Sequence, residues 1–92
     1  MAAEAQPLRI QWTTRAVRDM RRLAGSERRR IAAKVEQYAE DPTSLANQVI
    51  QLAGGTYRRL RVGDYRVLFT TERGTTVVMV VTRVRHRREA YD

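Results

Sequence analysis

The sequence contains no cysteine and a single histidine, His86. The missing cysteines exclude disulfide bonds and thiolate metal sites, and one histidine does not supply a usual zinc site. No apolar run reaches the roughly 18 residues that suggest a membrane span. Residues 1–9 lack the basic flank and apolar core of a signal peptide. We therefore expect a cytoplasmic protein with no membrane partner.

Acidic residues are few, since 10 of them stand against 18 basic residues and give a net charge of +8. Lys34 is the only lysine, so almost every positive charge is a guanidinium. A guanidinium presents a planar fork that binds phosphate through two hydrogen bonds, although a high-GC genome also favours arginine codons. An excess of this kind indicates a polyanionic partner such as RNA.

Residues 57–69 read YRRLRVGDYRVLF and predict a β-hairpin around Gly63-Asp64. Glycine in the first turn position favours a type II′ turn, or type I′ if Asp64 also takes a positive φ. A two-residue loop places Arg61 opposite Arg66. One face of the hairpin then carries Leu60, Val62, Tyr65, Val67 and Phe69, and the other carries Arg59, Arg61, Arg66 and Leu68.

The facing arginines of this hairpin are unusual, because like charges directly opposite each other destabilise a strand pair. An anion bound between the arginines would relieve the repulsion. The alternative is a solvated face whose guanidiniums splay apart.

The remaining elements follow from spacing and turn signals. Residues 8–12 alternate as a short strand, and Thr13 or Thr14 caps a helix that Gly25 ends. Ser26 caps a second helix, which Asp41-Pro42 stops. A short strand follows at residues 48–52. Residues 76–83 are apolar on both faces and predict a central strand that is covered on both sides or nearly so.

Together these elements predict a single α+β domain over residues 1–92, with residues 1–7 loosely attached. The order is β-α-α-β-β-β, a mostly antiparallel sheet with a helical hairpin packed on one face. A two-residue loop at Arg73-Gly74 would place Phe69 opposite Val78 and Arg66 opposite Val81. Further arginines then continue the arginine face, namely Arg83 and Arg85.

Few residue patterns in the chain point to catalysis. There is no phosphate-binding glycine loop, and the carboxylates near the C-terminus are scattered among arginines, so we expect neither metal nor cofactor. RNA cleavage by attack of the substrate's own 2′-hydroxyl stays possible, because the protein then has only to neutralise charge and move two protons. His86, Glu89 and Tyr91 are candidates for the proton transfers. The alternative interpretation is that His86 is an ordinary surface histidine and that Tyr91 packs on the edge of the sheet.

Two segments, RLRVGDYRVLF at residues 59–69 and VRHRREAY at residues 84–91, resemble the RelE/ParE toxin superfamily and specifically RelE-like toxins of type II toxin–antitoxin modules. The resemblance implies a ribosome-dependent endoribonuclease that cleaves mRNA and inhibits translation. It also implies a cognate antitoxin that is acidic, partly disordered and DNA-binding, and a toxin–antitoxin hetero-oligomer.

The resemblance also assigns roles to individual residues. Arg66 matches a phosphate-binding arginine, and Arg87 matches the arginine that stabilises the transition state and leaving group. Tyr91 matches a tyrosine that takes part in cleavage, and His86 matches a basic position of variable type. The expected RNA-binding set is Arg59, Arg61, Arg83, Arg85 and Arg88.

The sequence departs from the family pattern at Arg85, where relatives often carry glycine, and at Tyr57, where lysine is common. These departures bear on the strength of cleavage and not on the fold. Two other functions also stay open for a chain of this fold. One is a ParE-like toxin that inhibits DNA gyrase by protein contact, and the other is an RNA-binding relative without catalytic activity. Fold alone does not choose among them.

Overall fold

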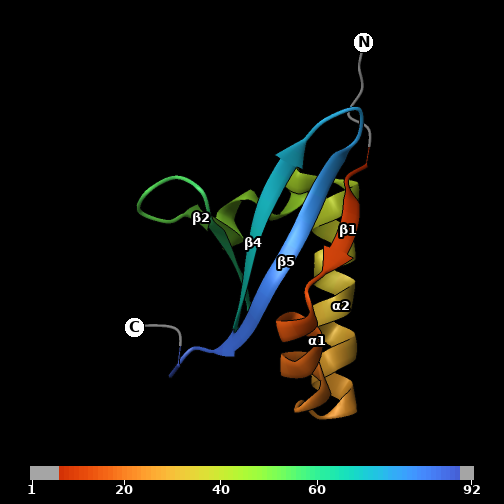
Figure 1. Ribbon diagram of the computed structural model, residues 1–92. Coiled ribbons are helices and arrows are strands. Elements are labelled where there is room, and N and C mark those ends of the chain that lie inside the picture. The colour runs from red at the N-terminus through yellow and green to blue at the C-terminus, as the bar shows by residue number, and fades with distance from the viewer. Residues whose placement is uncertain (1–6, 90–92) are drawn as a thin grey trace.

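The computed structural model describes residues 7–89 as a five-stranded sheet with the helices on one face (Figure 1). The strand order is β1-β5-β4-β3-β2, and β1 pairs with β5 in parallel while the other pairs are antiparallel. The predicted α+β fold is thereby confirmed. The elements are β1 (Arg9–Trp12), α1 (Thr14–Arg21), α2 (Gly25–Glu40), the 3₁₀ helix η1 (Pro42–Gln48), β2 (Val49–Gln51), β3 (Arg58–Val62), β4 (Tyr65–Arg73) and β5 (Val77–His86).

The observed helix boundaries agree with the predicted ones at the start of α1 and at the end of α2, and they differ from them at the turn between α1 and α2. Thr13 caps α1, since its hydroxyl accepts the N–H of Ala16, and α2 ends at Glu40 just before Asp41-Pro42. The prediction that Gly25 ends the first helix and Ser26 caps the second is wrong. Gly25 already begins α2, with Ala24 as an N-cap that has no side-chain bond.

The guanidinium of Arg28 links α2 to the end of α1 at this turn. Its Nη1 donates to the carbonyl of Leu23 at 3.1 Å and to that of Met20 at 3.5 Å. The last turn of α1 thus receives a side-chain cap from α2, which favours a positive charge at that position.

The core fills the space between the helices and the inner face of the sheet. Phe69, Leu60 and Val67 are completely buried, as the alternation of the hairpin predicts, and Ile31 and Val35 meet them from α2. Burying one such side chain contributes roughly 1.5–3 kcal/mol. The hairpin and α2 therefore share one apolar interior.

The hairpin has the predicted register, with Arg61 opposite Arg66 and Leu60 opposite Val67. Gly63 has φ +57°, whereas Asp64 does not take a positive φ. The turn is therefore of type II′, and type I′ is excluded because it needs a positive φ at both central residues.

The register of β5 differs from the prediction. The loop before β5 has three residues, 74–76, because Arg73 pairs with Val77. Phe69 consequently lies opposite Val81 rather than Val78, and Arg66 does not face Val81. The pairing has shifted by three residues, and any odd shift exchanges the two faces of a strand.

β5 is fully covered on its helix side and partly covered on the other side by the described residues, in line with the expected strand that is covered on both sides or nearly so. Met79 and Val81 are completely buried, whereas Val78 and Val80 on the other face are partly exposed.

A β-bulge at Thr82 then restores the outward position of the arginines. Leu68 pairs with Arg83 and Phe69 with Val81, so Thr82 is an extra residue on β5. Without the bulge, simple alternation from Val81 would turn Arg83 into the core. With the bulge, Val84 is buried instead. Within residues 7–89, no helix has the length and apolarity needed to cross a membrane.

Candidate functional site

Three arginines lie side by side on the face of the sheet opposite the helices. Arg61 of β3 pairs with Arg66 of β4, and Arg66 pairs in turn with Arg85 of β5. We call these three residues the arginine row. Within residues 7–89, Arg61 and Arg66 form no ion pair with a carboxylate, and Arg85 has only Glu89 at 3.9 Å. The row therefore keeps most of its positive charge, which favours a bound anion.

The hairpin turn orients the middle arginine of the row. The Nη1 of Arg66 donates to the carbonyl of Gly63 at 3.0 Å and to that of Tyr65 at 3.1 Å. These bonds hold the guanidinium close to the turn. A cavity of about 200 Å³ opens beside it, lined by Asn47, Gln48, Ile50, Arg59, Arg61 and Arg66.

The same turn also holds Arg87, which follows β5. The N–H of Arg87 donates to the carbonyl of Asp64 at 2.7 Å, and its Nε lies 3.6 Å from the Asp64 carboxylate. The fold thus brings Arg66 and Arg87, which are far apart in the sequence, to the same two-residue turn. Both side chains of the Arg87–Asp64 pair are more than half exposed, so an incoming phosphate can compete for Arg87.

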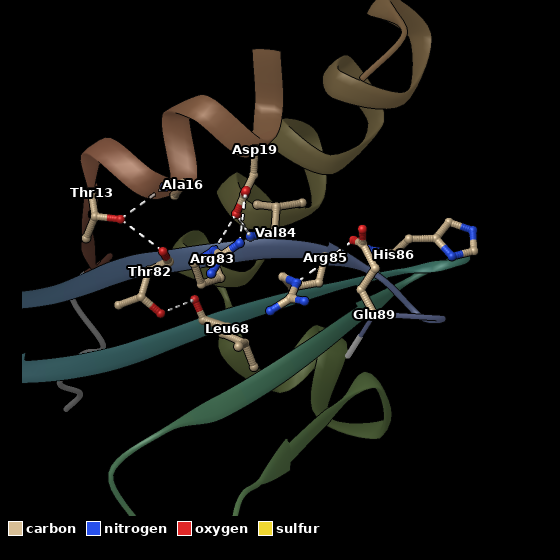
Figure 2. Close-up of polar contacts among 10 residues, drawn as sticks. All are labelled: Thr13, Ala16, Asp19, Leu68, Thr82, Arg83, Val84, Arg85, His86 and Glu89. Atoms are coloured by element: carbon tan, nitrogen blue, oxygen red, sulfur yellow. Dashed lines mark hydrogen bonds and ion pairs between the residues drawn. The ribbon is translucent and has the colours of Figure 1, made fainter. Parts of the chain in front are cut away.

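β1 pairs with β5 only as far as Val81. Beyond that point, Asp19 of α1 binds the edge of β5 that β1 leaves open (Figure 2). One carboxylate oxygen, Oδ2, accepts the Nε of Arg83 and the N–H of Val84, both at 2.8 Å. The carboxylate thereby satisfies a backbone N–H that a neighbouring strand would otherwise bind.

This contact stabilises the charged form of both partners. Burial alone would raise the pKa of the Asp19 carboxyl, but the hydrogen bonds from Arg83 and from the N–H of Val84 outweigh burial and hold the pKa below its usual value. The charge of Arg83 is largely neutralised by Asp19. Arg83 is therefore less available to a phosphate than the arginine row.

Threonines fix the bulge from both sides. The hydroxyl of Thr13 donates to the carbonyl of Thr82 at 3.0 Å, and the hydroxyl of Thr82 donates to the carbonyl of Leu68 at 3.2 Å. Both bonds are drawn in Figure 2. The bulge that turns Arg85 outward is thus held by α1 and β4.

His86 lies on the helix side of the sheet, whereas its neighbour Arg85 belongs to the arginine row on the other side. It pairs with Tyr65, and the two rings meet edge to face with centroids 5.3 Å apart. Its Nδ1 accepts the N–H of Arg88 at 3.2 Å, so a neutral ring carries its proton on Nε2. His86 and Glu89 line a second cavity of about 360 Å³ at the end of β5, together with Asp19, Arg22 and Arg85.

Tyr65 links this end of the sheet to α2. Its hydroxyl donates to the carboxylate of Glu27 at 3.1 Å, and burial together with this bond raises the pKa of the tyrosine. Tyr65 therefore stays protonated at neutral pH and acts as a structural contact.

The other predicted site residues are placed differently from one another. Arg59 lies opposite Leu68 on β3 and lines the cavity beside Arg66, whereas Arg88 is exposed after β5. Tyr91 lies outside the residues that the structure describes. Within residues 7–89, no three carboxylate or histidine side chains are grouped so as to hold a metal ion.

Sequence analysis missed Asp19 and the contact between Tyr65 and Glu27. A weak signal for Asp19 existed, because it is the only acidic residue among the arginines of α1. Its partners Arg83 and Val84 are more than sixty residues away, and spacing does not reveal such a contact.

The comparison with known families gives a match over most of the chain. Residues 10–91 match the family model described as the ParE toxin of the type II toxin–antitoxin system parDE. The chain belongs to this toxin family. A search of curated proteins gave no match.

Solved structures similar to the toxin are RelE proteins. The toxin is 26% identical to a chain of the RelBE2 toxin–antitoxin complex of Mycobacterium tuberculosis, covering 89% of the toxin and 100% of that chain with a TM-score of 0.69. The archaeal RelE–RelB complex of Pyrococcus horikoshii matches at 24% identity, with coverage of 92% and 100% and a TM-score of 0.74. A mutant of Escherichia coli RelE in the free state matches at 20% sequence identity. This match covers 92% of the toxin and 88% of the RelE chain, with a TM-score of 0.72. The toxin thus has a RelE-like fold within the RelE/ParE superfamily.

Proposed function

We propose that this toxin is a metal-independent, ribosome-dependent endoribonuclease that cleaves mRNA and thereby inhibits translation. The arginine row carries the proposal. Two guanidiniums without a carboxylate partner in residues 7–89 face each other on neighbouring strands, and the third is only weakly paired. The arrangement costs stability unless an anion lies between the side chains, and the RNA backbone supplies one phosphate per nucleotide.

The chemistry needs no group that the chain lacks. The 2′-hydroxyl of one nucleotide attacks the adjacent phosphorus and loses its proton to a base. The bond from phosphorus to the 5′-oxygen breaks, and that oxygen takes up a proton. The products are a 2′,3′-cyclic phosphate and a 5′-hydroxyl. Charge accumulates on the phosphoryl oxygens during this step, where fixed guanidiniums stabilise it.

We assign roles according to position. Arg66 and Arg87, which meet at the hairpin turn, bind the scissile phosphate and stabilise its developing charge. Arg61 and Arg85 bind the phosphates beside it. Tyr91 is our candidate for one proton transfer. His86 is the other candidate, and it would have to act from the end of β5, because its ring lies on the helix side of the sheet.

The family match favours a second candidate function. Because the matching model describes ParE toxins, inhibition of DNA gyrase by protein contact is the alternative. Such a toxin has no need of a phosphate between Arg61 and Arg66. The two functions therefore differ in whether the arginine row contacts RNA.

An antitoxin partner belongs to the proposal in either case. The similar structures from Mycobacterium tuberculosis and Pyrococcus horikoshii are toxin–antitoxin complexes. A chain with a net charge of +8 needs an acidic partner to mask its arginines. We propose an acidic, partly disordered segment that folds on binding and associates rapidly because of its opposite charge.

The test is in vitro translation followed by primer extension on the mRNA. We expect discrete cuts only when ribosomes are present. The Arg66→Ala variant should lower cleavage by on the order of 10² to 10³, as for the loss of one oxyanion donor. Arg73→Ala is the matched control, because it removes the same charge from the exposed far end of β4 and should cleave like the parent.

Two results would contradict the proposal. Breaks in DNA that depend on gyrase, without mRNA cuts, select the ParE-like function. Equal growth arrest by the parent and the Arg66→Ala variant removes Arg66 from the site.

A further inference from the structure

A basic cavity of about 280 Å³ lies between α2 and the β3–β4 hairpin, next to Arg61 at one end of the arginine row. Three cations surround it, namely Arg30 and Lys34 of α2 and Arg61 of β3. Leu45 and Val62 line its apolar part, and each is only 4% exposed. The cavity thus combines positive charge with an apolar surface.

The charges around this cavity are not neutralised by the described part of the chain. Within residues 7–89, none of the three cations forms an ion pair with a carboxylate. Lys34 donates only to the amide oxygen of Gln37, at 3.3 Å. Arg30 and Lys34 lie one turn apart on α2, where like charges repel. An anion is the group that this arrangement lacks.

The turn glycine allows Arg30 to lie against the hairpin. A Cβ atom on Gly63 would approach the Nη2 of Arg30 to 3.0 Å. The guanidinium therefore packs onto the backbone of the turn whose carbonyl also holds Arg66. Arg30 is positioned by the same turn as the proposed phosphate site.

The cavity adjoins the cavity on the open face, since Arg61 and Gln48 line both of them. β2 covers β3 only from Arg58 to Leu60, so Arg61 has no strand neighbour on this side. The two cavities thus lie on either side of Arg61 at this edge of the sheet, and we call them together the basic groove. An extended polyanion can follow it without leaving the positive surface.

We propose that this cavity is a nucleotide-binding subsite for the RNA strand whose neighbouring phosphates lie on the arginine row. Its phosphate binds Arg30 and Arg61, and its base packs on Leu45 and Val62 next to the amide of Gln48. Single-stranded RNA is recognised in this way, through the faces and hydrogen-bonding edges of unstacked bases. Pockets for small ligands have volumes of roughly 300–1,000 Å³. The volume of this cavity lies just below that range, so the cavity has room for a single nucleotide.

The nucleotide explains this cavity better than an acidic peptide does. A carboxylate would pair with the cations but has no flat face to pack against Leu45 and Val62, whereas a base has such a face and meets the amide of Gln48 at its edge. The inference rests on the proposed RNA-directed function. Its test therefore also measures how RNA binding depends on the arginine row, independently of this cavity.

The experiment measures binding of fluorescein-labelled uridine oligonucleotides, a trinucleotide and a dodecanucleotide, by anisotropy. Arg30→Ala should weaken binding of the longer RNA about tenfold and should reduce the salt slope by about 0.7, as for one lost phosphate contact. The trinucleotide has only two phosphates between its nucleosides, so it can bind on the arginine row without entering the cavity and should show a clearly smaller change. Arg29→Ala is the matched control, because it is exposed on the same helix and outside the cavity.

Each outcome separates the two proposals. If Arg30→Ala binds the longer RNA as Arg29→Ala does while Arg66→Ala weakens it, the subsite is wrong and the arginine row stands. If the parent binds no RNA at low salt, the RNA-directed function itself fails. If Arg30→Ala weakens binding of the cognate antitoxin but not of RNA, the cavity is a carboxylate site for a protein, and the nucleotide assignment is overturned.

Discussion

At the scale of single residues, Asp19 shows how one carboxylate supports a site that it does not touch. It closes the edge of β5 by accepting the N–H of Val84 and the guanidinium of Arg83. These contacts lie next to the bulge that turns Arg85 towards Arg66. Asp19 therefore positions the arginine row without belonging to it.

Replacing Asp19 by alanine should lower the free energy of unfolding by about 1.5–3 kcal/mol at pH 7, because the N–H of Val84 and the guanidinium of Arg83 lose a charged partner. The pKa of this carboxyl is lowered in the folded state from 3.8. Its contribution is thus complete above that value and is lost as the pH falls through the folded pKa.

Urea unfolding of the parent and Asp19→Ala across pH 2–7 checks both statements. The difference between them should shrink as the pH falls below about 4. Glu72→Gln, on the exposed end of β4, is the control and should stay close to the parent. A difference that does not change with pH would show that the charge of Asp19 has no part in the effect.

At the scale of elements, the β3–β4 hairpin joins the core to the site. Its inner face supplies Leu60, Val67 and Phe69, which are completely buried, and its outer face supplies two members of the arginine row. Its turn holds Arg66, Arg87 and Arg30 through backbone groups and close packing. A change in the turn should therefore affect stability and RNA contacts together.

The Gly63→Ala substitution tests this role. Gly63 has φ +57°, and its new Cβ would displace the guanidinium of Arg30. We expect a loss of roughly 1–2 kcal/mol in stability, because an L-residue is strained in this conformation. Thermal unfolding measures it.

Gly74→Ala is the matched control for the turn. Gly74 has no positive φ, and the nearest atom to an added Cβ is the carbonyl oxygen of Thr76 at 4.0 Å. Its stability should stay within about 0.5 kcal/mol of the parent. If both variants lose the same stability, the turn geometry is not the cause.

At the scale of the whole molecule, charge governs what the toxin meets. A net charge of +8 on 92 residues attracts polyanions over several ångströms and repels other basic proteins. The arginine row and the basic groove concentrate this charge at one end of β3 and β4. Long-range attraction and local contacts thus favour the same region.

Binding to ribosomes should consequently weaken steeply with salt. Each phosphate contact with single-stranded RNA contributes about 0.7 to the slope of log affinity against log salt concentration. Sedimentation with ribosomes over a salt series measures this slope. A flat response would point to a protein target such as gyrase.

The sequence by itself determined the hairpin, because a Gly-Asp turn between alternating strands sets both register and faces within a short segment. It also determined the basic character of the chain and the family motifs. These features depend on neighbours along the chain, so local patterning was enough to place Leu60, Arg61 and Arg66 correctly.

Only the tertiary structure decided the register of β5, the bulge at Thr82 and the position of His86. The predicted loop was one residue too short, and the bulge compensated for the resulting exchange of faces. A bulge is stabilised by partners distant in sequence, here Thr13 and Leu68, whose contributions no local pattern contains. The cavity beside Arg30 has the same origin, since α2, η1 and β3 meet only when the core forms.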